Sequence, residues 1–163
     1  MNKSTKIRRY AEGTSVPVQT SKAELEALLQ RYGASGFYSS WDSDEGVQVI
    51  GFRMRERILR LEVKIPGDSD VIQPHRLPHQ PEKRAEWYRS AVENEHRRRW
   101  RALVLIVKAK LEIVASGEAP FETEFLAHIL LPDGQTVGRA LLPKLAEAYD
   151  SGKMPKRLLP GPA

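Results

Sequence analysis

Residues 95–114, EHRRRWRALVLIVKAKLEIV, form the segment on which the architecture of this chain depends. Five consecutive apolar residues occupy positions 103–107, and apolar residues recur at helical spacing on either side of them. A helix whose centre is apolar on every side is buried by neighbouring elements. We therefore predict a long central helix from about residue 82 to about residue 116, with Gly117 as its stop.

Basic residues crowd the upstream half of this helix, around Trp100. At about 100° per residue, four of them share one flank, whereas Arg99 and Lys110 lie across the apolar stripe. A basic strip of this kind can follow a phosphate backbone, with salt-dependent affinity that comes from counterion release. The alternative is that nearby glutamates, Glu93, Glu95 and Glu112, neutralise the strip. The four candidate phosphate-binding residues are Arg97, Arg98, Arg101 and Lys108.

Three segments upstream of the central helix predict an antiparallel meander. Residues 36–41 are rich in aromatic side chains, and a DSDEG turn then leads into residues 47–54. In residues 58–65, ILRLEVKI, apolar and charged residues alternate, as they do in a strand with one buried face. A short edge strand at residues 16–18 is also expected.

Helices are predicted on both sides of these elements. The first has an apolar face of leucines, a cap at Thr20 or Ser21 and an end at Gly33. After the central helix, residues 121–131 read as helical, and an LPDG turn follows. Thr136 then caps a final helix. The leucines of the first helix are Leu25, Leu28 and Leu29, and the apolar face of the last carries Leu141, Leu145 and Tyr149.

The order of these elements predicts an α+β fold. We expect a three-stranded antiparallel meander packed on an N-terminal helix and a long central helix, with two C-terminal helices closing the core. A single domain is predicted over residues 14–155, with a Pro-rich surface loop at 66–81. Residues 1–13 read as a mobile basic arm, and residues 156–163 as a loose tail.

Charge and composition favour an anionic partner. The 163 residues carry a formal net charge of +5, and nucleic acid is the commonest anionic partner of such a protein. The chain has no cysteine, which fits an intracellular location. Its longest run of large apolar residues, five, is far too short for a membrane span, so we expect no membrane contact and a cytoplasmic protein.

The outward face of the predicted sheet is a second candidate for nucleic-acid binding. Phe37 or Trp41 would stack on bases if either side chain stands on that face. The alternative is that both aromatic residues belong to the core and that Glu62 neutralises its neighbours. The basic residues expected on this face are Arg53, Arg55, Arg60 and Lys64.

Glu62-Val63-Lys64, on the third strand, is similar to the E-x-K core of the PD-(D/E)xK nucleases. That resemblance implies a Mg²⁺ site in which Asp44 or Asp42 is the upstream ligand and Glu62 the second. Lys64 would position the attacking water, and Glu24 or Glu26 would be the helix acid. The alternative is an ordinary solvated strand face. Apart from this site, the sequence predicts no metal and no cofactor.

Two long stretches resemble small proteins encoded in tailed-phage and prophage genomes. They are TSVPVQTSKAELEALLQRYGASGF and RWRALVLIVKAKLEIVASGEAPFETEFLAHILLPDGQTVGRALLPKLAEAYDSGKMP. That group has no assigned activity, so the resemblance implies a mobile-element origin, a host-cell location and no catalytic residues. Our leading hypothesis is a non-enzymatic nucleic-acid-binding accessory protein. The alternative is a modulator or inhibitor that docks on a host enzyme or defence complex.

Overall fold

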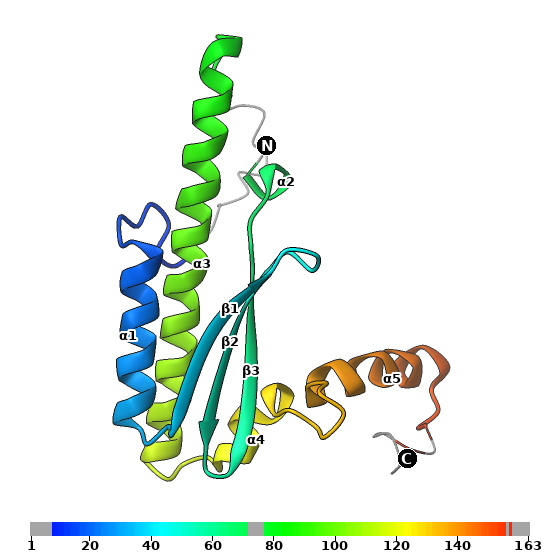
Figure 1. Ribbon diagram of the computed structural model, residues 1–163. Helices are drawn as coiled ribbons and strands as arrows, with labels where there is room; N and C mark the ends of the chain where they lie inside the picture. The colour runs from blue at the N-terminus through cyan, green and yellow to red at the C-terminus, as the bar shows by residue number, and fades with distance from the viewer. Residues whose placement is uncertain (1–7, 72–76, 156, 158–163) are drawn as a thin grey trace.

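A computed structural model describes residues 8–71, 77–155 and 157 (Figure 1). The predicted α+β architecture is confirmed: an N-terminal helix, a three-stranded antiparallel sheet, a long central helix and two C-terminal helices. Among these residues, no helix is both long and apolar enough to cross a bilayer. The elements are α1 (Val18–Arg31), β1 (Gly36–Asp42), β2 (Val47–Met54), β3 (Arg57–Lys64), α2 (Asp68–Val71), α3 (Arg84–Ala115), α4 (Phe121–Phe125) and α5 (Val137–Ser151), with 3-10 turns η2 (Pro81–Lys83) and η3 (Leu126–His128).

The sheet is a simple meander in the order β1-β2-β3. Gly51 is the central residue of one cross-strand row, paired with Tyr38 on β1 and with Arg60 on β3. A two-residue turn of Arg55 and Glu56 joins β2 to β3, and both residues have positive φ, 48° and 62°. Such backbone angles match the right-handed twist of the flanking strands, as in the tight hairpins of antiparallel sheets.

One face of the sheet packs against α1 and α3, which lie side by side (Figure 1). The core combines strand residues such as Phe52 and Leu59 with Leu29 of α1 and Trp100 of α3, all of them almost completely buried. The two helices run in the same direction. Ion pairs join Glu24 to Arg101 near one end of the contact and Arg31 to Glu112 near the other.

A polar link joins α3 to the inner face of β2. The indole nitrogen Nε1 of Trp100 donates a hydrogen bond to Gln48 Oε1 at 2.6 Å, and His96 Nε2 lies 3.2 Å from the same oxygen. A buried indole N–H needs an acceptor, because its desolvation is otherwise uncompensated. Gln48 therefore fixes how Trp100 packs on the sheet.

The outer edge of β3 is covered by the chain that follows η3. Leu130 N donates to Ile58 O at 2.8 Å, and Ile129 forms an isolated bridge with Leu59. The helix predicted over residues 121–131 is therefore shorter than expected: α4 and η3 end at His128, and an extended segment follows. Pairing with an open strand edge outweighs helix propensity here, because it satisfies backbone groups that the edge leaves free.

Some of the other local predictions are confirmed and others are wrong. The turn at LPDG and the cap at Thr136 are confirmed, and Thr136 Oγ1 accepts a hydrogen bond from Arg139 N at 3.2 Å. The edge strand at residues 16–18 is wrong, because α1 already begins at Val18 with Pro17 as its N-cap. The predicted cap at Thr20 or Ser21 is wrong for the same reason: both residues lie inside the first turn of α1.

The C-terminal helix α5 does not close the core as predicted. Only Val137 of this helix is buried, whereas Leu142 and Tyr149 are largely exposed. The helix extends away from the two-layer body (Figure 1). Its amphipathic pattern correctly predicts a helix but not the surface that its apolar side would cover.

Three predicted segments fall partly outside the described residues. Residues 1–7 of the predicted arm, residues 72–76 of the Pro-rich loop, and residues 156 and 158–163 of the predicted tail lie outside them. The rest of the Pro-rich loop contains α2 and η2. Residues 8–13, the remainder of the arm, form a turn stabilised by a hydrogen bond from Glu12 N to Arg9 O at 3.2 Å.

Candidate functional site

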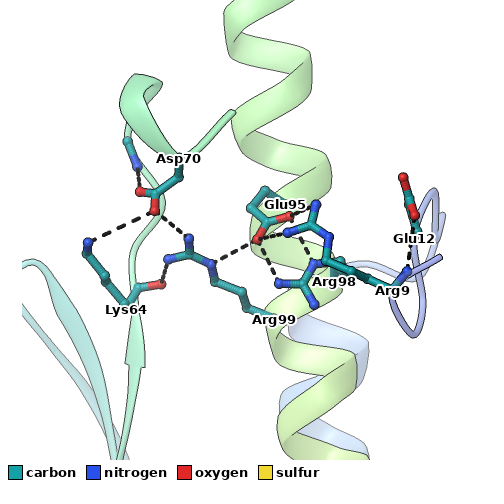
Figure 2. Close-up of polar contacts among 8 residues, drawn as sticks. Arg9, Glu12, Lys64, Asp70, Glu95, Arg98 and Arg99 are labelled. Atoms are coloured by element: carbon teal, nitrogen blue, oxygen red, sulfur yellow. Dashed lines mark hydrogen bonds and ion pairs between the residues drawn. The ribbon is translucent and has the colours of Figure 1, made fainter. Parts of the chain in front are cut away.

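Two arginines of α3 and Arg9 of the N-terminal turn surround a buried carboxylate, Glu95, which is only 6 % exposed (Figure 2). Arg98 Nη2 donates to its carboxylate at 2.7 Å, Arg9 Nη2 lies at 3.1 Å, and Arg99 Nε lies at 3.2 Å. Burial alone would raise the pKa of Glu95. Hydrogen bonds from Arg98 and Arg99 together with the nearby charges outweigh burial, and the pKa of this carboxyl lies below its usual value.

Arg99 extends the cluster to the segment after the sheet (Figure 2). Its guanidinium donates to Asp70 Oδ1 at 2.8 Å and to Lys64 O at 2.9 Å. A backbone hydrogen bond from Gly67 and the hydrogen bond from Arg99 lower the pKa of Asp70. The cluster therefore fastens α2 and the N-terminal turn to α3, which is a structural role.

Three of the four residues of the predicted helix strip are engaged in such pairs. Arg98 bonds Glu95, Arg97 bonds Glu93 and Asn94, and Arg101 bonds Glu24 of α1. Their side chains are 17 %, 20 % and 19 % exposed, respectively. The hydrogen bond that Arg101 donates to Glu24 raises the pKa of Arg101 further above its ordinary value. Lys108 differs, because it is exposed and has no ion pair within the described residues.

The outer face of the sheet is arranged differently from what the sequence suggests. The strand register places Phe37 opposite Phe52 and Trp41 opposite Gln48, so both aromatic residues belong to the helix-facing side. Arg55 is not on a strand face either: it occupies the β2–β3 turn, where its guanidinium lies 5.6 Å from the centre of the Phe121 ring. The predicted residues that do stand on the outer face are Arg53, Arg60 and Lys64.

Tyr38 is the aromatic residue on the outer face. Its ring lies across Gly51, so closely that a Cβ atom at Gly51 would be 1.9 Å from Tyr38 Cε1. Only glycine leaves this space, and the ring is 47 % exposed to solvent. The sequence analysis missed Tyr38 because polar and apolar residues do not alternate cleanly along β1. Such alternation is the signal that shows on which face of a sheet each side chain lies.

Three arginines at the end of the β2–β3 hairpin are exposed: Arg53, Arg55 and Arg57. Within the described part of the chain, none of their guanidinium groups pairs with a carboxylate. Arg60, in the row beside Tyr38, is instead held by Glu62 at 3.0 Å. Sequence reasoning also missed Arg57, although it immediately precedes the ILRLEVKI segment.

Two of the predicted nuclease residues, Glu62 and Lys64, lie beside other charged partners, and Asp44 lies in the turn between β1 and β2. Glu62 lies between Arg60 and Arg139, whose Nη2 is 3.5 Å from its carboxylate. Lys64 Nζ lies 4.0 Å from Asp70, and Asp44 donates its backbone N–H to Asp42 Oδ1 at 3.0 Å. Over residues 8–71, 77–155 and 157, no group of three or more His, Cys, Asp or Glu side chains could hold a metal ion.

The predicted helix acids lie in the other layer of the molecule. Glu24 is on α1 and bonds Arg101 of α3, and Glu26 is an exposed residue of the same helix. Glu62 stands on the outer face of β3, with the sheet between it and the helices. The structure therefore does not bring Glu24 or Glu26 together with Glu62.

The resemblance of this chain to tailed-phage and prophage proteins remains a prediction. Comparisons with protein-family models, with curated proteins and with solved structures find no match.

Proposed function

We propose that this protein binds single-stranded nucleic acid on the outer face of its sheet and catalyses no reaction. The observation that carries the proposal is Tyr38, whose ring is half exposed and lies across Gly51. Every base has a flat aromatic face, so a fixed ring on a sheet accepts unpaired bases with little regard to sequence. In a duplex those faces are already stacked on one another, which favours the single strand.

The hairpin arginines supply the charge that such a site needs. Arg53 is two residues from Gly51 on the same strand face, Arg55 lies in the turn that follows, and Arg57 begins β3 opposite Met54. A guanidinium group that has no carboxylate partner within the chain binds a phosphate more favourably than one that is already paired. The reason is that no existing ion pair must be broken. The outer face therefore combines a stacking ring with one available cation, Arg53, and two further cations lie beside it at the end of the hairpin.

The geometry favours the sheet over the helix strip that the sequence favoured. Arg97, Arg98 and Arg101 would each have to leave a carboxylate in order to contact phosphate. Lys108 alone of the strip is exposed without an ion pair in the described structure. The helix strip is the alternative binding site, and substitutions on the helix and on the sheet distinguish the two.

A labelled-oligonucleotide titration tests the proposal. Short fluorescent single strands of DNA and RNA, and a duplex of the same length, are titrated at low and at physiological salt. Tyr38→Ala should weaken single-strand binding by about 1–3 kcal/mol, the range for loss of one stacked base, whereas Tyr38→Phe should retain the affinity. Arg53→Gln should reduce the slope of log K against log salt by about 0.7, the value for one phosphate contact with a single strand.

Lys108→Gln and Arg101→Gln are the matched controls, because both remove a positive charge from the helix layer. Neither should alter the affinity or the salt slope if the sheet is the site. If the helix substitutions weaken binding and the sheet substitutions do not, the site lies on α3. If the wild-type protein binds no strand at low salt, the proposed function itself is wrong.

The origin and location of the protein belong to the same proposal. As the resemblance to phage and prophage proteins implies, we propose that it acts in the cytoplasm of a host cell, where unpaired nucleic acid forms during replication and transcription. A modulator of a host protein would behave differently in the titration. It would show no strand binding, and one host protein would be recovered with it in stoichiometric amount from nuclease-treated lysate.

The nuclease prediction has its own test. Cleavage of labelled DNA or RNA that requires Mg²⁺ and is lost in Glu62→Ala would establish it. We expect no cleavage, because Glu62 is already paired with Arg60 and Arg139 and no carboxylate cluster surrounds it within the described residues.

A further inference from the structure

The side of α3 that faces away from the sheet carries an apolar stripe with no covering element among the described residues. Trp100, Val104, Val107 and Leu111 are buried, and the last three lie within about 40° of Trp100 around the helix. The stripe lies on the opposite side, between about 140° and 240° from Trp100. Three of its residues are large and exposed: Leu105 at 45 %, Ile106 at 51 % and Ile113 at 38 %. Its members are Ala102, Leu105, Ile106, Ala109 and Ile113.

The stripe has definite limits along the helix. Upstream, the same side of α3 carries Glu95, which the N-terminal turn covers through Arg9. Between Ala102 and Ile113, every charged residue lies outside the stripe. The exposed length is about 16 Å, or three helical turns. An uninterrupted apolar helix face of this length is costly to leave in water.

We propose that this face of α3 is the contact between two copies of the chain, packed as antiparallel helices. Ala102, Ile106, Ala109 and Ile113 are spaced four, three and four residues apart, which is the repeat of a helix–helix seam. A two-fold axis midway between residues 107 and 108 places Ala102 opposite Ile113 of the second copy. The same axis places Ile106 opposite Ala109 of the second copy. Each layer then combines one large and one small side chain, which is how closely packed helices fill their interface.

Charges beside the stripe favour the same arrangement. α1 and α3 are parallel, with Arg101 and Glu24 at one level and Glu112 and Arg31 at the other. The two-fold axis brings Arg101 toward Glu112 of the second copy, and Glu24 toward Arg31 of the second copy. Both contacts join opposite charges, which favours this register.

A parallel pair of helices would give Arg101 a less favourable neighbour. It would turn the flank of Arg101 toward the other flank of the second copy, which carries Arg99. Arg101 would then lie beside Arg99 of the second copy, whereas the antiparallel register places it beside Glu112 of the second copy. The charge of this neighbour favours the antiparallel register.

Sedimentation equilibrium over a range of concentrations tests the association. The wild-type mass should rise from 18.5 kDa toward twice that value. Ile106→Glu should remain at the monomer mass at every concentration, with an unchanged circular dichroism spectrum because Ile106 is half exposed in the monomer. Leu142→Glu is the matched control: Leu142 is an exposed leucine on α5, 66 % exposed, and its replacement should leave the dimer intact. A wild-type protein that is monomeric throughout, or a dimer lost only in Leu142→Glu, overturns the proposal.

Cysteine cross-linking tests the register, and the absence of native cysteine makes the result unambiguous. Mild oxidation of a mixture of Ala102→Cys and Ile113→Cys should give a disulfide-linked heterodimer. Ala102→Cys alone should give none, because the antiparallel register separates the two copies of residue 102 by about 16 Å along the helix, beyond the reach of a disulfide. Efficient cross-linking of Ala102→Cys with itself overturns the antiparallel arrangement.

The ends of the chain provide the remaining control. Residues 1–7 and 158–163 lie outside the described residues, and Leu158 and Leu159 are apolar. Variants lacking either segment should dimerise as the full chain does. A full-length monomer that dimerises only after such a deletion would show that the chain covers its own stripe, and the proposal would be wrong.

Discussion

The ring of Tyr38 occupies the space that a side chain at Gly51 would need, since a Cβ atom there would lie 1.9 Å from Tyr38 Cε1. The two residues face each other across β1 and β2. Alanine is otherwise better than glycine in the interior of a strand by about 0.5–1 kcal/mol, because glycine loses more conformational freedom on folding. The effect of adding a methyl group at residue 51 should therefore depend on whether Tyr38 is present.

Gly51→Ala should destabilise the wild-type protein by about 1–3 kcal/mol, the usual cost of overpacking, because the ring must rotate away. In a Tyr38→Ala background the same substitution should be neutral or stabilising. Urea denaturation of the four proteins of this cycle measures the coupling. Gly51→Ala should also weaken oligonucleotide binding as Tyr38→Ala does, because it displaces the ring. Equal costs in both backgrounds would contradict the assigned contact.

Glu95→Gln should release the N-terminal turn from α3. The substitution leaves Arg9, Arg98 and Arg99 close together without the carboxylate that holds them. Removing one partner of a buried ion pair costs about 3–5 kcal/mol, and the partial exposure of Arg9 places the expected loss at the lower end of that range. Urea denaturation measures the loss, and hydrogen exchange at Glu12 and Thr14 should report the release of the turn.

Glu93→Gln is the control for that experiment. Glu93 also pairs with an arginine of α3, but its side chain is 64 % exposed. An exposed helical pair of this kind contributes about 0.3–0.5 kcal/mol, so little change in stability or exchange is expected. A similar loss in both variants would mean that burial of Glu95 is not what gives its ion pairs their strength.

Gln48→Met should destabilise the fold by about 1–3 kcal/mol through the loss of one hydrogen-bond acceptor. The indole N–H of Trp100, which now donates to Gln48 Oε1 at 2.6 Å, would be left without this partner in the core. Trp100→Phe removes the donor, so Gln48→Met should cost less in that background. Urea denaturation of the double-mutant cycle, followed by circular dichroism, checks the prediction. Additive losses would contradict it.

Stability should fall as the pH drops below about 6.5, the ordinary pKa of histidine in an unfolded chain. Burial, followed by the charges of Lys22 and Arg99, lowers the pKa of His96, and burial with the charge of Lys110 lowers that of His128. Between the unfolded and the folded pKa values the unfolded chain binds more protons, so the free energy of unfolding decreases as the pH falls. Each histidine contributes at most about 1.4 kcal/mol per pH unit in this window.

Urea denaturation at about pH 7.5 and about pH 5.5 measures this dependence on either side of the histidine pKa. The loss between the two values should be smaller in His96→Gln than in the wild-type protein. The lowered pKa values of Glu95 and Asp70 act in the same direction at lower pH, near and below the ordinary range of carboxyl groups. An equal loss in His96→Gln would show that His96 does not contribute.

The central helix and the meander could be predicted because the periodic spacing of their apolar residues indicates which side of each element is buried. Alternation in ILRLEVKI gives both the strand and its buried side, and the apolar centre of residues 95–114 gives a helix that must be covered. α5 shows the limit of this reasoning. Leu145 and Tyr149 predict an amphipathic helix, but the pattern carries no information about which surface, if any, covers it.

The partners of long charged side chains could not be predicted in the same way. Sequence spacing correctly suggests that Glu93 and Glu95 neutralise part of the arginine strip. Arg101 bonds Glu24, however, which is 77 residues away in the chain. That pair depends on how α1 packs beside α3, which no local pattern determines. Tyr38 was missed for a related reason, because the side of a residue on β1 follows from the register with β2.

The parallel arrangement of α1 and α3 has an electrostatic consequence for the hairpin. Both helices end near the β2–β3 turn: Ser35 N, just after α1, donates to Arg53 O at 2.9 Å, and Arg55 lies over Phe121, shortly after α3 (Figure 1). Each helix macrodipole places about half a negative charge at its C-terminal end. Dipoles of antiparallel neighbours cancel, whereas these two add, so their negative ends gather at one pole of the molecule. The hairpin arginines offset that negative pole and so stabilise both helix ends whether or not a ligand is bound.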